Sequence, residues 1–117
     1  MAKIATTIEQ SQQLAKILSI ESADMMYQKY ETVIGDDYGY AYRIQPFFSS
    51  DIEGIPCWSL AALLAVLHFP SLHKTISGWR CDTYRNDNKH IMYGESKDNP
   101  VDACVEMILK LHELKML

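Results

Sequence analysis

The spacing of hydrophobic residues predicts a helix near the start of the chain. Thr7 and Gln10 form a capping box, in which Thr7 caps the helix and Gln10 reaches back to it. Apolar residues at helical spacing follow over Leu14–Leu18, and the polar run Ser11–Gln13 is expected to face solvent. The pattern therefore predicts an amphipathic first helix.

A second helix is predicted from Ser22 to Gly35. Apolar and aromatic residues recur there at three- and four-residue steps: Met26, Tyr27, Tyr30, Val33 and Ile34. Gly35 is well placed to end the helix in a left-handed conformation.

The next segment, Tyr38–Gln45, alternates with a period of two, which is typical of a strand. One face carries Tyr38, Tyr40, Tyr42 and Ile44. The other face carries Gly39, Ala41, Arg43 and Gln45. Pro46 is expected to end the strand, because proline cannot donate to a sheet, and residues 47–55 are expected to form a loop.

A third helix is predicted over Leu60–Leu67 with Ser59 as its cap. It is apolar on every side, so we expect it to be central and buried. Phe69 precedes Pro70, and a residue before proline avoids the helical region, so the helix should stop there. Residues 71–78 are expected to be a connector.

The last third of the chain predicts a hairpin. Trp79–Tyr84 alternates, and a second strand is expected over His90–Tyr93. Asn86–Asn88 suits the tight turn between them, since Asn and Asp tolerate positive φ.

A final helix begins where Asn99 serves as the cap, Pro100 occupies the first helical position and Asp102 puts negative charge in the first turn. Glu106 and Lys110 are expected to form an exposed pair. The core-facing residues are expected to be Val101, Cys104, Val105, Ile108 and Leu109. The order is thus α-α-β-α-β-β-α: one small α+β domain over residues 1–117, with an antiparallel sheet and a C-terminal hairpin followed by a helix.

Composition narrows the function classes. The 117 residues include 48% hydrophobic residues, enough for a core. The net charge is −4 with scattered Lys and Arg, which makes nucleic-acid binding an unfavoured function. The most apolar run, Leu60–Leu67, is far shorter than the ~20 residues of a membrane span, and residues 1–6 lack a signal peptide's apolar stretch. The odd number of widely spaced cysteines favours a reducing cytoplasm.

Cys57 is the candidate nucleophile. It precedes a predicted helix, whose dipole would lower the thiol pKa, and His68, His73 or His90 would act as its base. No cysteine-enzyme signature surrounds it, so a small buried residue beside Trp58 is the favoured interpretation.

Metal binding and acid–base chemistry receive less support. The cysteines and histidines lack the spacings of zinc sites: Cys57, Cys81, Cys104, His68, His73, His90 and His112. We therefore predict no metal and no cofactor. The acidic residues in predicted turns would suit a cation or paired carboxylates, but Asp is common in turns for local reasons: Asp36, Asp37, Asp51 and Glu53.

The tyrosine strand is the strongest binding candidate. Exposed aromatic residues beside an arginine are typical of protein–protein hot spots, and the strand is followed by a further aromatic residue. The candidate binding residues are Tyr38, Tyr40, Tyr42, Arg43 and Phe47. The favoured interpretation is that the tyrosines pack over the helices as core, because aromatic strand faces usually pack, and the interface interpretation stays open beside it.

Several segments also carry a family resemblance. Thr7–Ser11, Ala23–Met25, Ile55–Leu64 and Asn99–Leu111 resemble, in this order, a family of small uncharacterised proteins from gut bacteria and their prophages or mobile elements. The resemblance covers most of the chain and is most specific at Trp-Ser-Leu and at the opening of the last helix. It implies a cytoplasmic accessory protein of a mobile element, and it supplies no catalytic residue.

The leading hypothesis is therefore a non-enzymatic, homo-oligomeric or partner-binding assembly protein. The alternatives are a small thiol-dependent enzyme that uses Cys57 and a nucleic-acid-binding or antitoxin-like regulator.

Overall fold

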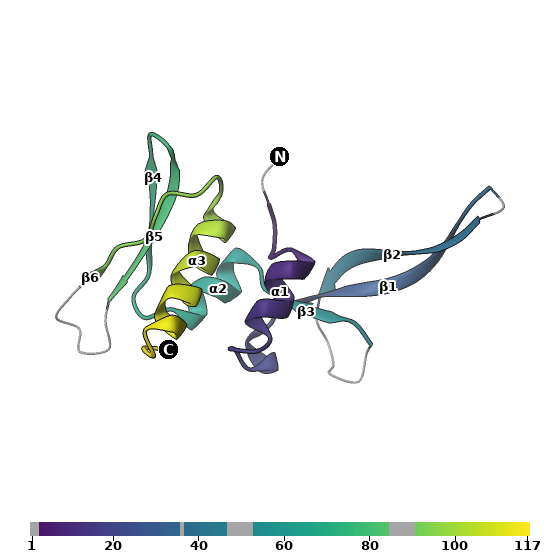
Figure 1. The fold of residues 1–117 in the computed structure, drawn as a ribbon, viewed down its shortest axis with the longest axis horizontal. Helices are drawn as coiled ribbons and strands as arrows, with labels where there is room; N and C mark the ends of the chain where they lie inside the picture. Colours follow the sequence, from purple (N-terminus) through teal and green to yellow (C-terminus); the bar gives the residue numbers. More distant parts are fainter. Residues whose placement is uncertain (1–2, 36, 47–52, 85–90) are drawn as a thin grey trace.

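The computed structural model describes residues 3–35, 37–46, 53–84 and 91–117, which adopt a mixed α+β fold (Figure 1). The helices in these ranges are α1 (Ile8–Leu14), α2 (Leu60–Val66), α3 (Pro100–Glu113) and a short 3-10 helix (Ile20–Ser22). The strands are β1 (Met25–Ile34), β2 (Asp37–Pro46), β3 (Ile55–Cys57), β4 (Ser71–Thr75), β5 (Gly78–Tyr84) and β6 (Ile91–Met92). They form two antiparallel sheets, ordered β2-β1-β3 and β4-β5-β6. The α+β class is confirmed, while the predicted order of elements is only partly matched.

The N-terminal capping box of α1 is confirmed. The Gln10 backbone N donates to Thr7 Oγ1 at 3.1 Å, and the Thr7 backbone N donates to Gln10 Oε1 at 3.0 Å. The predicted solvent exposure of Ser11 is wrong: this residue is buried, and its hydroxyl lies 2.7 Å from the Thr6 hydroxyl. The reason is that the segment before α1 bonds to the chain before α2, through Thr6 N and Trp58 O at 3.0 Å, and so covers this side of the helix.

The helix predicted from Ser22 to Gly35 is wrong, because most of this segment forms strand β1. All ten residues of β1 pair with β2 in an antiparallel register. The segment is rich in aromatic and β-branched residues, which favour strands, and the next segment supplies a complete pairing partner. Gly35 does adopt a left-handed conformation, with φ 65°, but it does so in the hairpin turn between β1 and β2.

The predicted strand over Tyr38–Gln45 is confirmed as β2, and Pro46 is its last residue. The predicted loop over residues 47–55 lies outside the described residues as far as residue 52. Its end differs from the prediction, because Ile55–Cys57 forms β3 and pairs with the start of β1.

Ser59 caps α2 as predicted, since its Oγ accepts from Ala62 N at 3.3 Å. The prediction that this helix is central and buried holds for one of its faces only. Leu63 is fully buried, whereas Ala61 and Ala65 are exposed. The helix is short and packs by one face against α3, so its opposite face meets solvent.

The predicted connector over residues 71–78 is also wrong, because Ser71–Thr75 forms β4 and pairs with β5. Leu72 packs against the core, and the polar residues around it are typical of an edge strand. The C-terminal hairpin is confirmed: β5 and β6 are antiparallel, with Thr83 opposite Met92. The predicted turn Asn86–Asn88 lies outside the described residues.

The start of α3 matches the prediction. Asp102 N donates to Asn99 Oδ1 at 2.9 Å, and Pro100 occupies the first turn. Asp102 Oδ1 also accepts from Lys3 Nζ at 2.5 Å and from Gln10 Nε2 at 2.8 Å. Burial alone would raise the pKa of Asp102, but the hydrogen bonds from Lys3, Gln10 and Asn99 hold this pKa below its usual value. The N-terminal segment is therefore bound to the first turn of the last helix.

The core face of α3 is confirmed in large part: Val101, Cys104, Val105 and Ile108 are buried, and Leu109 packs partly buried against them. The predicted pair of Glu106 and Lys110 is wrong, because each side chain bonds to the preceding segment instead. Lys110 Nζ donates to Tyr93 O at 3.0 Å, and Glu106 Oε2 accepts from Glu95 N at 3.4 Å.

Trp58 is the largest fully buried side chain, and it belongs to the core cluster formed by α1, α2, α3 and β5. Its indole Nε1 donates to Ser22 Oγ at 3.0 Å, and its backbone N donates to Thr6 Oγ1 at 3.1 Å. These bonds satisfy the polar atoms of Trp58, so its ring is buried without an unpaired donor.

The molecule is elongated. In Figure 1 the β1–β2 hairpin extends away from the helices, and the second sheet lies at the other end. The radius of gyration is 16.1 Å and the longest dimension is 59 Å. A compact domain of this length would have a radius of gyration of about 13 Å, so the hairpin accounts for an unusual shape.

Candidate functional site

The β1–β2 hairpin, which we call the hairpin arm, has an anchored base and a free outer part. At the base, Met26 is fully buried and Tyr27 donates its hydroxyl to Thr6 O at 2.7 Å. The strand β3 pairs only with residues 25–27 of β1. Beyond that point the two strands of the arm pair only with each other among the described strands.

Three tyrosines lie on one face of the outer arm, which we call the tyrosine face. Tyr38 is 84% exposed, Tyr40 64% and Tyr42 43%. Because strand residues alternate between faces, these side chains share one side of β2, as the sequence predicted. Their exposure contradicts the interpretation in which the tyrosines pack in the core, and the binding interpretation stays a prediction.

The tyrosine face also includes alternating residues of β1. Lys29 lies opposite Tyr42, and Glu31 lies opposite Tyr40. The Lys29 Nζ lies 4.0 Å from the centroid of the Tyr40 ring, within the range of a cation–π contact. The tyrosine face thus carries exposed aromatic rings together with one positively and one negatively charged side chain.

Arg43 lies on the opposite face of the arm, as the alternation predicted. Its guanidinium carbon is 5.3 Å from the centroid of the Tyr30 ring, which belongs to that same face. Both faces of the arm therefore pair a cationic side chain with an aromatic ring.

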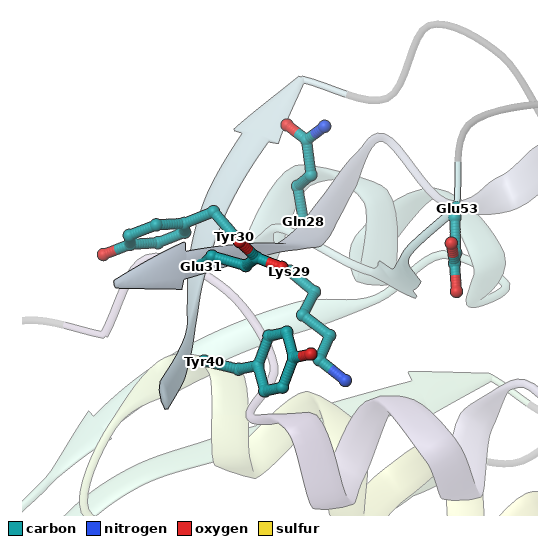
Figure 2. A pocket seen from close by; sticks show the side chains of 6 residues that line it. All are labelled: Gln28, Lys29, Tyr30, Glu31, Tyr40 and Glu53. Carbon is teal, nitrogen blue, oxygen red and sulfur yellow. The ribbon is translucent and has the colours of Figure 1, made fainter. Parts of the chain in front are cut away.

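A hollow of about 370 Å³ lies at the β1 edge of the arm (Figure 2). Figure 2 shows Lys29 reaching toward the Tyr40 ring and Tyr30 pointing the other way, while Glu53 lies apart, close to the segment that leads to β3. The hollow is lined by Gln28, Lys29, Tyr30, Glu31, Tyr40 and Glu53. Small-molecule sites are concave and lined mainly by apolar side chains, whereas four of the six residues that line this hollow are polar or charged.

Some predicted site residues lie outside the described residues. These are the candidate binding residue Phe47, the acidic residues Asp36 and Asp51, and the candidate base His90. Of the other two acidic candidates, Asp37 begins β2 and Glu53 lines the hollow beside the arm.

Cys57 is placed differently from what a nucleophile requires. It has no exposed surface and is paired with Met25 in the β1–β3 sheet. Burial, with a further contribution from the Asp24 carboxylate, raises the pKa of the Cys57 thiol to about 12. The favoured interpretation of Cys57 as a small buried residue is confirmed. The alternative, in which the helix that follows lowers the thiol pKa, is wrong in direction, because burial outweighs any effect of that helix.

We expect Cys57 to react slowly with alkylating reagents in the folded protein. At pH 7.5 a thiol with this pKa is almost entirely protonated, and the thiolate is the reacting form. Iodoacetamide labelling followed by peptide mass spectrometry, with and without denaturant, measures the rate at each cysteine. Labelling of Cys57 in the native protein as fast as in denaturant would contradict the expectation.

The other two cysteines are buried and contact each other. The interaction between the thiols of Cys81 on β5 and Cys104 on α3 lowers the pKa of Cys81, and this interaction together with burial raises the pKa of Cys104. Among the described residues, no group of three or more His, Cys, Asp or Glu side chains is arranged to hold a metal ion.

The sequence did not reveal a cluster around Asp82, which is 3% exposed. Arg80 donates to both of its carboxylate oxygens, from Nε and a terminal nitrogen, each at 3.0 Å. His73 Nε2 lies 3.3 Å from Asp82, and Gly94 N donates to it at 3.1 Å. Because His73 pairs with Arg80 across the two strands, reading β4 as a strand would have shown this cluster.

This cluster does not form a catalytic serine–histidine–aspartate triad. Ser71 Oγ lies 3.1 Å from His73 Nε2, but Asp82 contacts the same nitrogen. A triad requires the serine and the aspartate on opposite ring nitrogens, so that the proton can pass through the imidazole. The cluster is therefore an ion-pair network that holds β4, β5 and the segment after β6 together.

Comparison of the chain with protein-family models, with curated proteins and with solved structures finds no match. The resemblance to proteins of gut bacteria and mobile elements therefore stays a prediction. Within the described ranges, the structure contains no helix long and apolar enough to span a membrane.

Proposed function

We propose that the protein is a non-enzymatic binding or assembly module that contacts a protein partner through the tyrosine face of its hairpin arm. The observation that carries the proposal is the exposure of Tyr38, Tyr40 and Tyr42 on an arm that extends away from the body. Large aromatic side chains add no core packing there, whereas tyrosine is enriched at the centres of protein interfaces.

Three further features support a binding role over a catalytic one. The hollow beside the arm is lined by polar side chains, and a protonated Cys57 thiol is a poor nucleophile. The Asp82 network lacks the geometry of a proton relay.

The proposal includes a cytoplasmic location and an accessory role in a mobile element. The three cysteines are all unpaired thiols, which suits a reducing compartment, and the mobile-element role follows from the sequence resemblance.

We expect Tyr40→Ala and Tyr42→Ala to weaken association by about tenfold or more, since truncating a hot-spot aromatic residue costs about 1–2 kcal/mol or above. Both side chains are exposed, so the free energy of unfolding should change by less than about 1 kcal/mol. Light scattering measures self-association, quantitative pull-down from the native host measures other partners, and thermal melting checks the fold.

Tyr93→Ala is the matched control, because Tyr93 is 59% exposed but lies outside the arm. It should leave association unchanged. Unaltered association of both arm variants, with normal melting, would refute the proposal. So would binding of single-stranded DNA at low salt that is lost in the same variants, since exposed aromatic rings also stack on bases.

A further inference from the structure

Among the described residues, no strand pairs with the outer edge of β2 along the arm. In the sheet order β2-β1-β3, β2 pairs only with β1 among the described strands. Natural edge strands are usually protected by charged side chains, by proline or by a covering segment. The edge of β1 has such protection from β3, Lys29 and Glu31, whereas β2 has no charged residue or proline between Tyr38 and Tyr42.

The backbone N–H and C=O groups of the tyrosines point toward this edge of β2, away from β1. Ile34 lies opposite Asp37, so the hairpin turn is closed by this pair, which exchanges backbone hydrogen bonds. In an antiparallel ladder, such pairs alternate with pairs whose N–H and C=O groups point away from each other. The register is continuous, so the N–H and C=O groups of Tyr38, Tyr40 and Tyr42 are directed outward.

The sequence of this edge is close to a palindrome. Read from Tyr40 in either direction, a small residue comes first and a tyrosine second: Tyr38-Gly39-Tyr40-Ala41-Tyr42. An antiparallel pairing of two such strands, centred on Tyr40, places Tyr38 of each copy opposite Tyr42 of the other. Each outward-directed N–H of one copy then faces an outward-directed C=O of the other copy. No charged side chain lies opposite a side chain of the same charge.

We propose that the partner of the arm is a second copy of this chain, joined edge to edge through β2 in an antiparallel register centred on Tyr40. This inference rests on the proposed function and specifies its partner. The three facing tyrosine pairs would exchange about six backbone hydrogen bonds, two for each pair. The two-fold axis is perpendicular to the sheet, so the tyrosine faces of both copies lie on the same side of a joined sheet.

The register makes the pairing specific. Aromatic residues directly opposite each other on one sheet face stabilise the pairing by roughly 0.2–1 kcal/mol each. A shift of the register by one residue would place tyrosines of one copy opposite Gly39 or Ala41 of the other. The tyrosine faces of the two copies would then lie on opposite sides of the joined sheet, and the aromatic contacts would be lost. The centre at Tyr40 therefore keeps both the backbone hydrogen bonds and the aromatic pairs.

Disulfide trapping in the full-length protein tests this register. Gly39→Cys and Ala41→Cys keep all three tyrosines, and a side chain at Gly39 meets nothing within 4 Å. In the proposed register, residue 39 of one copy faces residue 41 of the other with a Cα separation of about 4.5 Å, which suits a disulfide. The same position in the two copies, 39 with 39 or 41 with 41, lies on a diagonal at about 7–8 Å, which is too far for a disulfide to form readily.

Under mild oxidation with copper phenanthroline, an equal mixture of the two variants should give several-fold more cross-linked dimer than either variant alone. The native cysteines should form no cross-links between copies, because Cys57, Cys81 and Cys104 have no exposed surface. If a single variant cross-links as much as the mixture or more, the proposed register is overturned. If the wild-type protein is a dimer but the mixture is not cross-linked, the interface lies elsewhere and the inference is overturned.

Native mass spectrometry separates this inference from the proposed function. A wild-type protein that stays monomeric at high concentration, yet loses a different protein partner on Tyr40→Ala, would overturn the second-copy inference and leave the proposed function standing. A monomer for which the tyrosine variants alter no association would overturn both.

Discussion

Replacing Trp58 with alanine should lower the free energy of unfolding by about 3–5 kcal/mol, the largest loss we expect from a single substitution. Trp58 has no exposed surface, and its removal leaves a cavity inside the cluster of α1, α2, α3 and β5. It also leaves Ser22 without the indole donor at 3.0 Å. Domains of this kind have about 5–15 kcal/mol in total, so the variant should be partly unfolded at physiological temperature.

Urea unfolding followed by circular dichroism measures this loss, and Trp58→Phe is the control. Phenylalanine keeps most of the apolar contact and loses the indole hydrogen bond, which contributes about 1 kcal/mol. The control should therefore fall between the wild type and Trp58→Ala. A midpoint for Trp58→Ala equal to that of the wild type would show that Trp58 is not at the centre of the core.

Gly78→Ala should also destabilise the protein, by roughly 1–3 kcal/mol or more, because two constraints meet at this position. Gly78 has φ 143°, a conformation that residues with a Cβ rarely adopt. An added Cβ would lie 2.1 Å from Lys97 O, which is backbone and cannot rotate away. The clash would open the bridge in which Trp79 and Lys97 exchange two hydrogen bonds of 2.7 Å.

Gly39→Ala is the matched control for this effect. Gly39 also lies in a strand, but an added Cβ meets nothing within 4 Å and its φ is not in the left-handed region. Its free energy of unfolding should stay within about 0.5 kcal/mol of the wild-type value. Thermal melting of both variants, under the same conditions, checks the difference; similar melting temperatures would contradict our description of the Gly78 turn.

Local signals predicted the N-terminal ends of α1, α2 and α3 well. Thr7, Ser59 and Asn99 each accept the capping hydrogen bond that their positions indicated. Capping depends on three or four consecutive residues, so it can be recognised without knowledge of the rest of the fold. The strand β2 was recognised for a similar reason, because its alternation is continuous.

The failures involve strands whose pattern depends on a partner. β1 has aromatic residues at helical spacing, and only its pairing with β2 decides that it is extended. β4 has mostly polar residues because it lies at a sheet edge, so its hydrophobic signal is weak. Secondary structure of this kind is set by tertiary contacts that a single sequence does not display.

The candidate site was predicted in part. Alternation placed the three tyrosines on one face, but only the structure decides that this face is exposed, since an equal alternation occurs on buried sheets. For Cys57 the sequence favoured a small buried residue, which the structure confirms, and burial is also the larger effect on its pKa. The Asp82 network depends on the pairing of β4 with β5 and therefore went unnoticed.

The attachment of Lys3 to Asp102 has a consequence for synthesis of the chain, because the two residues are 99 positions apart. The arm is complete by residue 46, whereas α3 supplies much of the core and closes the N-terminal segment. At about 5–20 residues per second, several seconds separate the two events on the ribosome. During that interval Trp58 lacks the helix that completes its core cluster, so the largest buried side chain of the fold stays uncovered until the last helix is made.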